Sequence, residues 1–229
     1  MANDRKYIQN LLHKGKGLVV RWLTLVAFVF VCLWAQAQST PTNNKQKDAE
    51  QLGKALEYFA SKKYHECLLI LQGLDKQYRL NPRYKAYLGV CHYYEWDYEN
   101  AVKQLTVAIP KLVNFAPHER SFYYWALAES YFNLRRYDEA ASCYHEMLKL
   151  CYEKERGEVY YRLGFCSLFG EDWAFAWSNF YAAWNYFHRY RPGEEQARMA
   201  QIENMLRALN GKVASEALMH IGINEAKGK

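Results

Sequence analysis

The chain has 229 residues, of which 51% are hydrophobic and 17% aromatic, enough apolar material for one domain with a substantial core. Its 30 basic and 24 acidic residues give a net charge of +6, but five of the basic residues and one acidic residue lie in positions 1–37. The remainder carries a net charge of only +2 and no dense Lys/Arg stripe, which argues against nucleic acid as a partner.

Residues 1–37 have the pattern of a secretory signal peptide. Basic residues precede an uncharged apolar run of 13 residues from Trp22 to Trp34, and Ala35-Gln36-Ala37 supplies a small-x-small cleavage signal. The run is shorter than the ~20 residues that a membrane-spanning helix needs. We therefore expect cleavage after Ala37 and a periplasmic or envelope-associated location, with retention of the leader as an anchor as the alternative.

Residues 38–47 are polar and predict a flexible lead-in, after which a repeated pattern begins. At four places an aromatic residue is followed three positions later by a small one: Tyr64/Cys67, Tyr98/Ala101, Tyr137/Ala140 and Trp173/Ala176. The small residues recur after 34, 39 and 36 residues. A period in the thirties is typical of stacked helical hairpins, so residues 48–211 are predicted to be one helical repeat domain.

The third unit shows the pattern within each hairpin. Apolar residues recur at helical spacing, the pair Arg135-Arg136 marks a turn, and helical spacing then resumes. Small residues recur on the first helices as well, and we expect them to face the small residues of the second helices where the backbones cross closely; they are Ala55, Gly89, Ala128 and Gly164. Such hairpins cannot bury their apolar stripes alone and therefore stack.

A last helix is predicted from Glu194 to Leu209, between Pro192-Gly193 and Asn210-Gly211. Its apolar residues form one stripe, made of Met199, Ile202, Met205, Leu206 and Leu209. This helix would cap the last hairpin, with a loose amphipathic tail as the alternative, and residues 212–229 are expected to be flexible.

The pattern resembles the tetratricopeptide repeat (TPR) family over residues 48–187. The third unit carries the resemblance through Tyr124, Leu127, Ala128, Tyr131, Tyr137, Asp138, Glu139, Ala140 and Tyr144. The chain departs from the family where Cys67 replaces the usual alanine and where the linkers vary in length. The resemblance implies an all-α, right-handed solenoid of about four repeats with a C-terminal capping helix.

The resemblance also implies that the first helices line a concave groove that holds a segment of a partner protein. The groove positions carried over from the family are Arg83, Tyr87, Val90, Tyr93, Tyr94, Phe122, Trp125, Glu129, Phe132, Glu158, Tyr161, Arg162, Phe165 and Phe169. They are mostly aromatic, which suits binding hot spots. The alternative is that some of these rings, Tyr87, Tyr161 and Phe165 among them, only pack between neighbouring helices.

Trp177 and Tyr181 would form a second docking patch or a self-association face, unless the C-terminal helix covers them. Family members that hold the carboxyl end of a chaperone use a Lys, Asn and Arg clamp, and here the asparagine positions of that clamp hold Val90 and Ala126. A chaperone tail is therefore not the expected partner.

No pattern of catalytic, metal-ligating or cofactor-binding residues is evident. The five cysteines after the leader include no CxxC, and their odd number leaves at least one thiol unpaired; they are Cys67, Cys91, Cys143, Cys151 and Cys166. We expect a non-enzymatic adaptor without cofactor or metal that binds another protein in an envelope-associated complex. The alternatives are a binding module for a small apolar ligand or cell-wall fragment, and a self-associating spacer.

Overall fold

The computed structural model describes the backbone of residues 41–227 and the side chains of residues 44–214. The expected signal peptide and its cleavage site lie outside the described residues, so both stay predictions. The chain divides into two compact units, residues 1–51 and 52–229. Of the first unit the structure describes the beginning of helix α2 (Pro41–Ala60), so residues 41–47 of the expected lead-in are helical.

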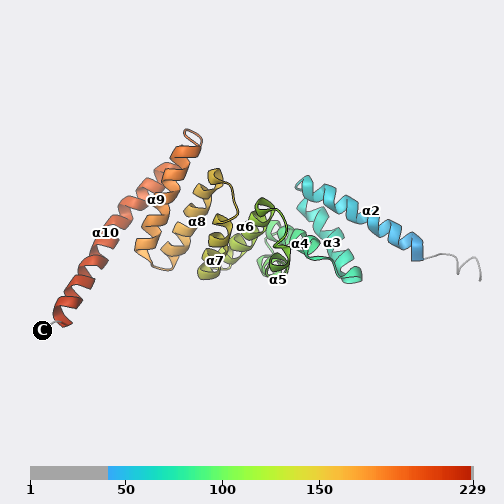
Figure 1. Ribbon diagram of the computed structural model, residues 1–229, viewed down its shortest axis with the longest axis horizontal. Coiled ribbons are helices and arrows are strands. Elements are labelled where there is room, and N and C mark those ends of the chain that lie inside the picture. Colours follow the sequence, from blue (N-terminus) through green and yellow to red (C-terminus); the bar gives the residue numbers. More distant parts are fainter. Residues whose placement is uncertain (1–40, 228–229) are drawn as a thin grey trace, which may run out of the picture. The chain divides into compact units, whose positions relative to one another are not determined.

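The second unit consists of helices packed in successive pairs, and its described part contains no strand (Figure 1). This confirms the predicted all-α solenoid. After the end of α2, the helices are α3 (Tyr64–Tyr78), α4 (Pro82–Tyr94), α5 (Tyr98–Ala108), η1 (Ile109–Leu112), α6 (Pro117–Asn133), α7 (Tyr137–Leu148), η2 (Glu153–Glu155), α8 (Arg156–Phe169), α9 (Trp173–Tyr190) and α10 (Gln196–Lys227). The four aromatic residues predicted to open second helices are the first residues of α3, α5, α7 and α9.

None of the described helices is both long and apolar enough to cross a membrane.

The turn inside each hairpin has the same backbone geometry. One residue per turn has a left-handed φ of about 60°, and these residues are Lys62, Trp96, Arg135 and Glu171. In the second hairpin the N–H of Trp96 donates to the carbonyl of Tyr93 at 3.0 Å, and the N–H of Asp97 donates to that of His92 at 2.9 Å. This is the Schellman motif, which satisfies the last carbonyls of the first helix. The residue that follows is the N-cap of the second helix, and in the second hairpin the Asp97 carboxylate accepts the N–H of Asn100.

The small residues predicted at the helix crossings are all buried, which confirms the packing basis of the repeat. The expectation that small residues face one another is wrong for both glycines. A Cβ atom on Gly89 would lie 2.6 Å from Cγ of Leu105, and one on Gly164 would lie 2.7 Å from the ring of Phe180. Each glycine thus leaves room for a large side chain one turn beyond the small residue of the second helix, and a large residue fills that space better than a second small one.

Two of the aromatic residues that open second helices connect neighbouring hairpins. Tyr64, the first residue of α3, stacks on Tyr94 at the end of α4 with ring centroids 3.9 Å apart. Tyr137, the first residue of α7, stacks on Phe169 at the end of α8 at 4.9 Å. These rings explain part of the aromatic content of the repeat, because each pair stabilises an interface between hairpins.

Helix α10 covers the last hairpin, as the capping prediction required. Ile202 and Leu209 are buried in one cluster with Phe180 and Phe187. The predicted helix end at Asn210-Gly211 is wrong, because α10 continues to Lys227. An Asn-Gly pair ends a helix when the glycine adopts a left-handed φ, and among the described glycines only Gly193 does so. A glycine inside a helix costs only about 1 kcal/mol, which does not end the helix by itself.

Candidate functional site

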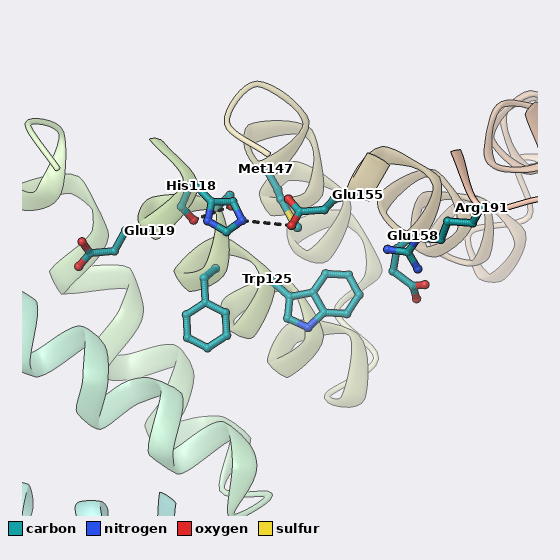
Figure 2. Close-up of a pocket in the computed structure, with 9 residues that line it drawn as sticks. His118, Glu119, Trp125, Met147, Glu155, Glu158 and Arg191 are labelled. Carbon is teal, nitrogen blue, oxygen red and sulfur yellow. Dashed lines mark hydrogen bonds and ion pairs between the residues drawn. The ribbon is translucent and has the colours of Figure 1, made fainter. Parts of the chain in front are cut away.

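A cavity of about 480 Å³ opens between α6, α7, η2 and α8 (Figure 2). Phe122 and Trp125 of α6 and Met147 of α7 give it an apolar lining. The remaining lining residues are polar or charged: His118, Glu119, Ser121, Glu155, Glu158 and Arg191. Cavities of this size with a few polar groups around an apolar surface are typical of sites that bind a side chain or a small molecule.

The carboxylates that line the cavity are held by groups from neighbouring elements. Glu155 accepts a hydrogen bond from His118 at 3.1 Å, drawn as a dashed line in Figure 2. Glu119 is paired with the Arg83 guanidinium through two hydrogen bonds of 2.8 and 3.1 Å. Glu158 is paired with Arg198 of α10. The charges are thus largely compensated within the chain, which leaves the apolar lining as the main feature of the cavity surface.

A buried ion pair lies beside this cavity. Glu129 is 3% exposed, accepts a hydrogen bond from the hydroxyl of Tyr144 and lies 2.9 Å from Nη2 of Arg162. Burial raises the pKa of the Glu129 carboxyl, while the Arg162 charge and the Tyr144 hydrogen bond oppose that rise. The Arg162 guanidinium also lies 5.8 Å from the Trp125 ring, and the Trp125 ring packs edge-on against Tyr144 at 5.9 Å. The pair therefore helps to fix the indole ring that lines the cavity.

Three of the predicted groove residues line this cavity: Phe122, Trp125 and Glu158. Three others are buried and offer a partner almost no surface; they are Val90, Glu129 and Tyr161. The Tyr161 hydroxyl donates to the side chain of Gln201 at 2.9 Å, so it contacts the capping helix.

The other predicted groove residues lie outside the cavity. Arg83 is exposed and pairs with Glu119, whereas Tyr94 and Phe169 are 40% and 50% exposed on one face and stacked between hairpins on the other. The rest are half-buried and contact other rings or buried charges: Tyr87, Tyr93, Phe132, Arg162 and Phe165. Their role in binding stays a prediction.

In the predicted second patch, Trp177 is half-buried and its indole N–H donates to Asn210 of α10 at 2.7 Å. Tyr181 is 47% exposed and stacks on Trp177 at 5.2 Å. The capping helix therefore engages one ring of the patch and leaves the other accessible.

Sequence reasoning did not select six of the lining residues, namely His118, Glu119, Ser121, Met147, Glu155 and Arg191. One local signal could have indicated His118 and Glu119. Pro117 is typical of the first position of a helix, so the two residues after it are expected in the first turn of α6. Arg191 follows the end of α9, and no local pattern connects it with α6. Within the described part of the chain, no group of three or more potential metal ligands is present.

Comparison with known proteins agrees with this architecture. A tetratricopeptide repeat family model matches residues 121–154, which hold most of α6 and all of α7. No curated protein matches the sequence significantly.

Solved structures match over most of the chain. MamA AMB-1 superposes with a TM-score of 0.59 at 14% identity, over 78% of this chain and 90% of that one. MamA MSR-1 gives a TM-score of 0.57 at 15% identity, over 76% of this chain and 92% of that one. The apo form of RapI gives a TM-score of 0.57 at 10% identity, over 78% of this chain and 68% of that one. At these identities the likeness concerns the fold. The chain therefore contains one recognisable tetratricopeptide repeat, in α6 and α7, and shares its all-helical fold with these structures.

Proposed function

We propose that this protein is an exported adaptor that binds a segment of another protein through the first helices of its repeats, with the cavity beside Trp125 as the main anchor site. The observation that supports this proposal is the cavity itself, whose apolar lining of Phe122, Trp125 and Met147 is surrounded by oriented polar groups. The site has the size for one large apolar side chain and the chain around it. The partner would be an extended or helical segment with such an anchor residue.

Replacing Trp125 by alanine is expected to weaken partner capture about 30-fold, the equivalent of about 2 kcal/mol for a binding hot spot. The measurement is a pull-down from a detergent-solubilised envelope extract with increasing bait concentration. Phe175→Ala is the matched control, because Phe175 is 65% exposed on α9 and does not line the cavity. Circular dichroism checks that both variants keep their helicity. Equal capture by wild type and Trp125→Ala would contradict the cavity as the anchor site.

A small apolar ligand is the second candidate, and the volume and apolar lining of the cavity favour it. Tryptophan fluorescence of the wild type and of Trp125→Ala, titrated with peptides, glycans and lipids, separates the two. A response to glycan or lipid that is lost in the variant, with none to peptides, would favour the small-ligand function.

Export is the part of the proposal that rests on sequence alone. If residues 1–37 are a cleaved leader, N-terminal sequencing of the protein from a bacterial envelope fraction is expected to begin at Gln38. Recovery of the chain with Met1 intact from the cytosolic fraction would contradict export. It would leave the cavity proposal standing, because that proposal rests on α6, α7 and α8.

A further inference from the structure

Two cysteines lie at the interface between the first and second hairpins. Cys67 is on α3 and Cys91 is on α4, and both side chains are fully buried. They belong to one core cluster that also contains Leu71 and Leu88.

The register of α3 and α4 places the two cysteines opposite each other. The rings of Tyr64 and Tyr94 stack face to face, with an interplanar angle of 2°. Cys67 follows Tyr64 by three residues and Cys91 precedes Tyr94 by three. In antiparallel helices, equal steps in opposite directions along the chains keep residues at the same level of the interface. A step of three also stays on the same helix face.

Contacts on both sides of the pair support this register. Beyond the cysteines, Nζ of Lys85 on α4 lies 3.5 Å from Oδ1 of Asp75 on α3, so the two helices run antiparallel along the whole interface. Both cysteines are free thiols in this structure, and the influence of each on the other lowers the pKa of Cys67 and raises that of Cys91.

We propose that Cys67 and Cys91 form a disulfide that links the first hairpin to the second, made by exchange with an oxidised disulfide of the glutathione class. The Cys67 thiolate attacks one sulfur of the donor, whose S–S bond breaks and releases one thiol. Deprotonated Cys91 then attacks Sγ of Cys67, and the second donor thiol leaves. The two protein thiols lose two electrons and two protons, and the donor disulfide gains them. The linkage does not depend on the cavity or on any partner.

The interface between the third and fourth hairpins provides an internal comparison. Tyr137 stacks on Phe169 there, Ala140 follows Tyr137 by three residues, and Cys166 precedes Phe169 by three. The register is the same, but alanine takes the position that Cys67 holds in the first hairpin. Burial raises the pKa of the Cys166 thiol to about 12. An Ala140→Cys substitution is therefore expected to create a second pair of the same geometry.

The test begins with the full-length chain, unfolded and reduced, and then refolded in mixed reduced and oxidised glutathione so that the thiols meet the oxidant before burial. Wild type is expected to lose two of its six thiols and to yield a linked Cys67–Cys91 peptide in non-reducing peptide mapping. Its thermal midpoint is expected to rise above that of the reduced chain. Cys67→Ala is the matched control, since alanine holds this position in the other hairpins, and it should give no linked peptide at Cys91. Ala140→Cys should add a second linked peptide, between position 140 and Cys166.

Two results would overturn the proposal. The first is a wild-type chain in which Cys67 and Cys91 both stay free or carry only glutathione after refolding. The second is a mixture of linkages in which the Cys67–Cys91 peptide does not predominate, because a pair aligned by the fold must form in preference to other pairs.

Discussion

Replacing Gly164 by alanine is expected to lower the free energy of unfolding by about 1–3 kcal/mol, the range measured for overpacked cores. The added Cβ would lie 2.7 Å from two ring atoms of Phe180 and 2.9 Å from a third. Phe180 is fully buried, so its ring has no open space into which to move. Helix propensity has the opposite effect on the free energy of unfolding, because alanine is by itself about 0.5–1 kcal/mol more favourable than glycine inside a helix. Urea unfolding followed by circular dichroism measures the difference.

Gly73→Ala is the matched control for this substitution. Gly73 also lies inside a helix, α3, but a Cβ at this position would meet no heavy atom within 4 Å. The control is therefore expected to raise the free energy of unfolding by about 0.5–1 kcal/mol, so that the two substitutions have opposite signs. If both stabilise the protein, the close approach of α8 and α9 at Gly164 is not a constraint.

Replacing Glu129 by alanine is expected to lower the free energy of unfolding by about 3 kcal/mol, because it leaves the Arg162 charge and the Tyr144 hydroxyl without their partner. This is the lower end of the range for a broken buried ion pair. Arg162 keeps 29% of its side chain exposed and has Glu158 at 4.0 Å, so it is partly compensated. The double substitution Glu129→Ala, Arg162→Met tests the reason. The double variant should lose less free energy of unfolding than the two single variants lose together. Strict additivity would contradict the coupling between Glu129 and Arg162.

Glu129→Gln allows the raised pKa to be tested separately. Because the folded state raises the pKa of Glu129, the folded wild type binds more protons than the unfolded chain at pH values between the unfolded and folded pKa. Its free energy of unfolding therefore falls, relative to the Gln variant, as the pH rises through that interval. Urea unfolding at pH values from about 4 to 7 measures this difference. A constant difference, or one that grows in favour of the wild type, would show that the pKa is not raised.

Local spacing predicted the hairpins well because it depends on short stretches of sequence. The aromatic residue that begins each second helix and the small residue three positions later recur in every unit, and each aromatic is the first residue of its helix. The turns were harder to characterise. Lys62, Trp96, Arg135 and Glu171 adopt a left-handed φ that usually indicates glycine, so residue type alone did not identify the Schellman geometry.

The cavity was predictable only in part, because its lining comes from distant segments. Phe122 and Trp125 followed from their positions on a first helix, but Glu155 and Arg191 reach the same cavity from η2 and from the residue after α9. The burial of Glu129 likewise depends on Tyr144 and Arg162, which are supplied by two other helices.

The sequence by itself determined the all-helical repeat, its period, the residues that begin the second helices and the small residues at the crossings, because each of these follows from spacing within one hairpin. Only the tertiary structure decided which side chains each glycine accommodates, which charges are buried and compensated, where the cavity opens and which two cysteines face each other. Those properties depend on the register between helices of different segments, and register is set by the packing of whole surfaces rather than by local pattern.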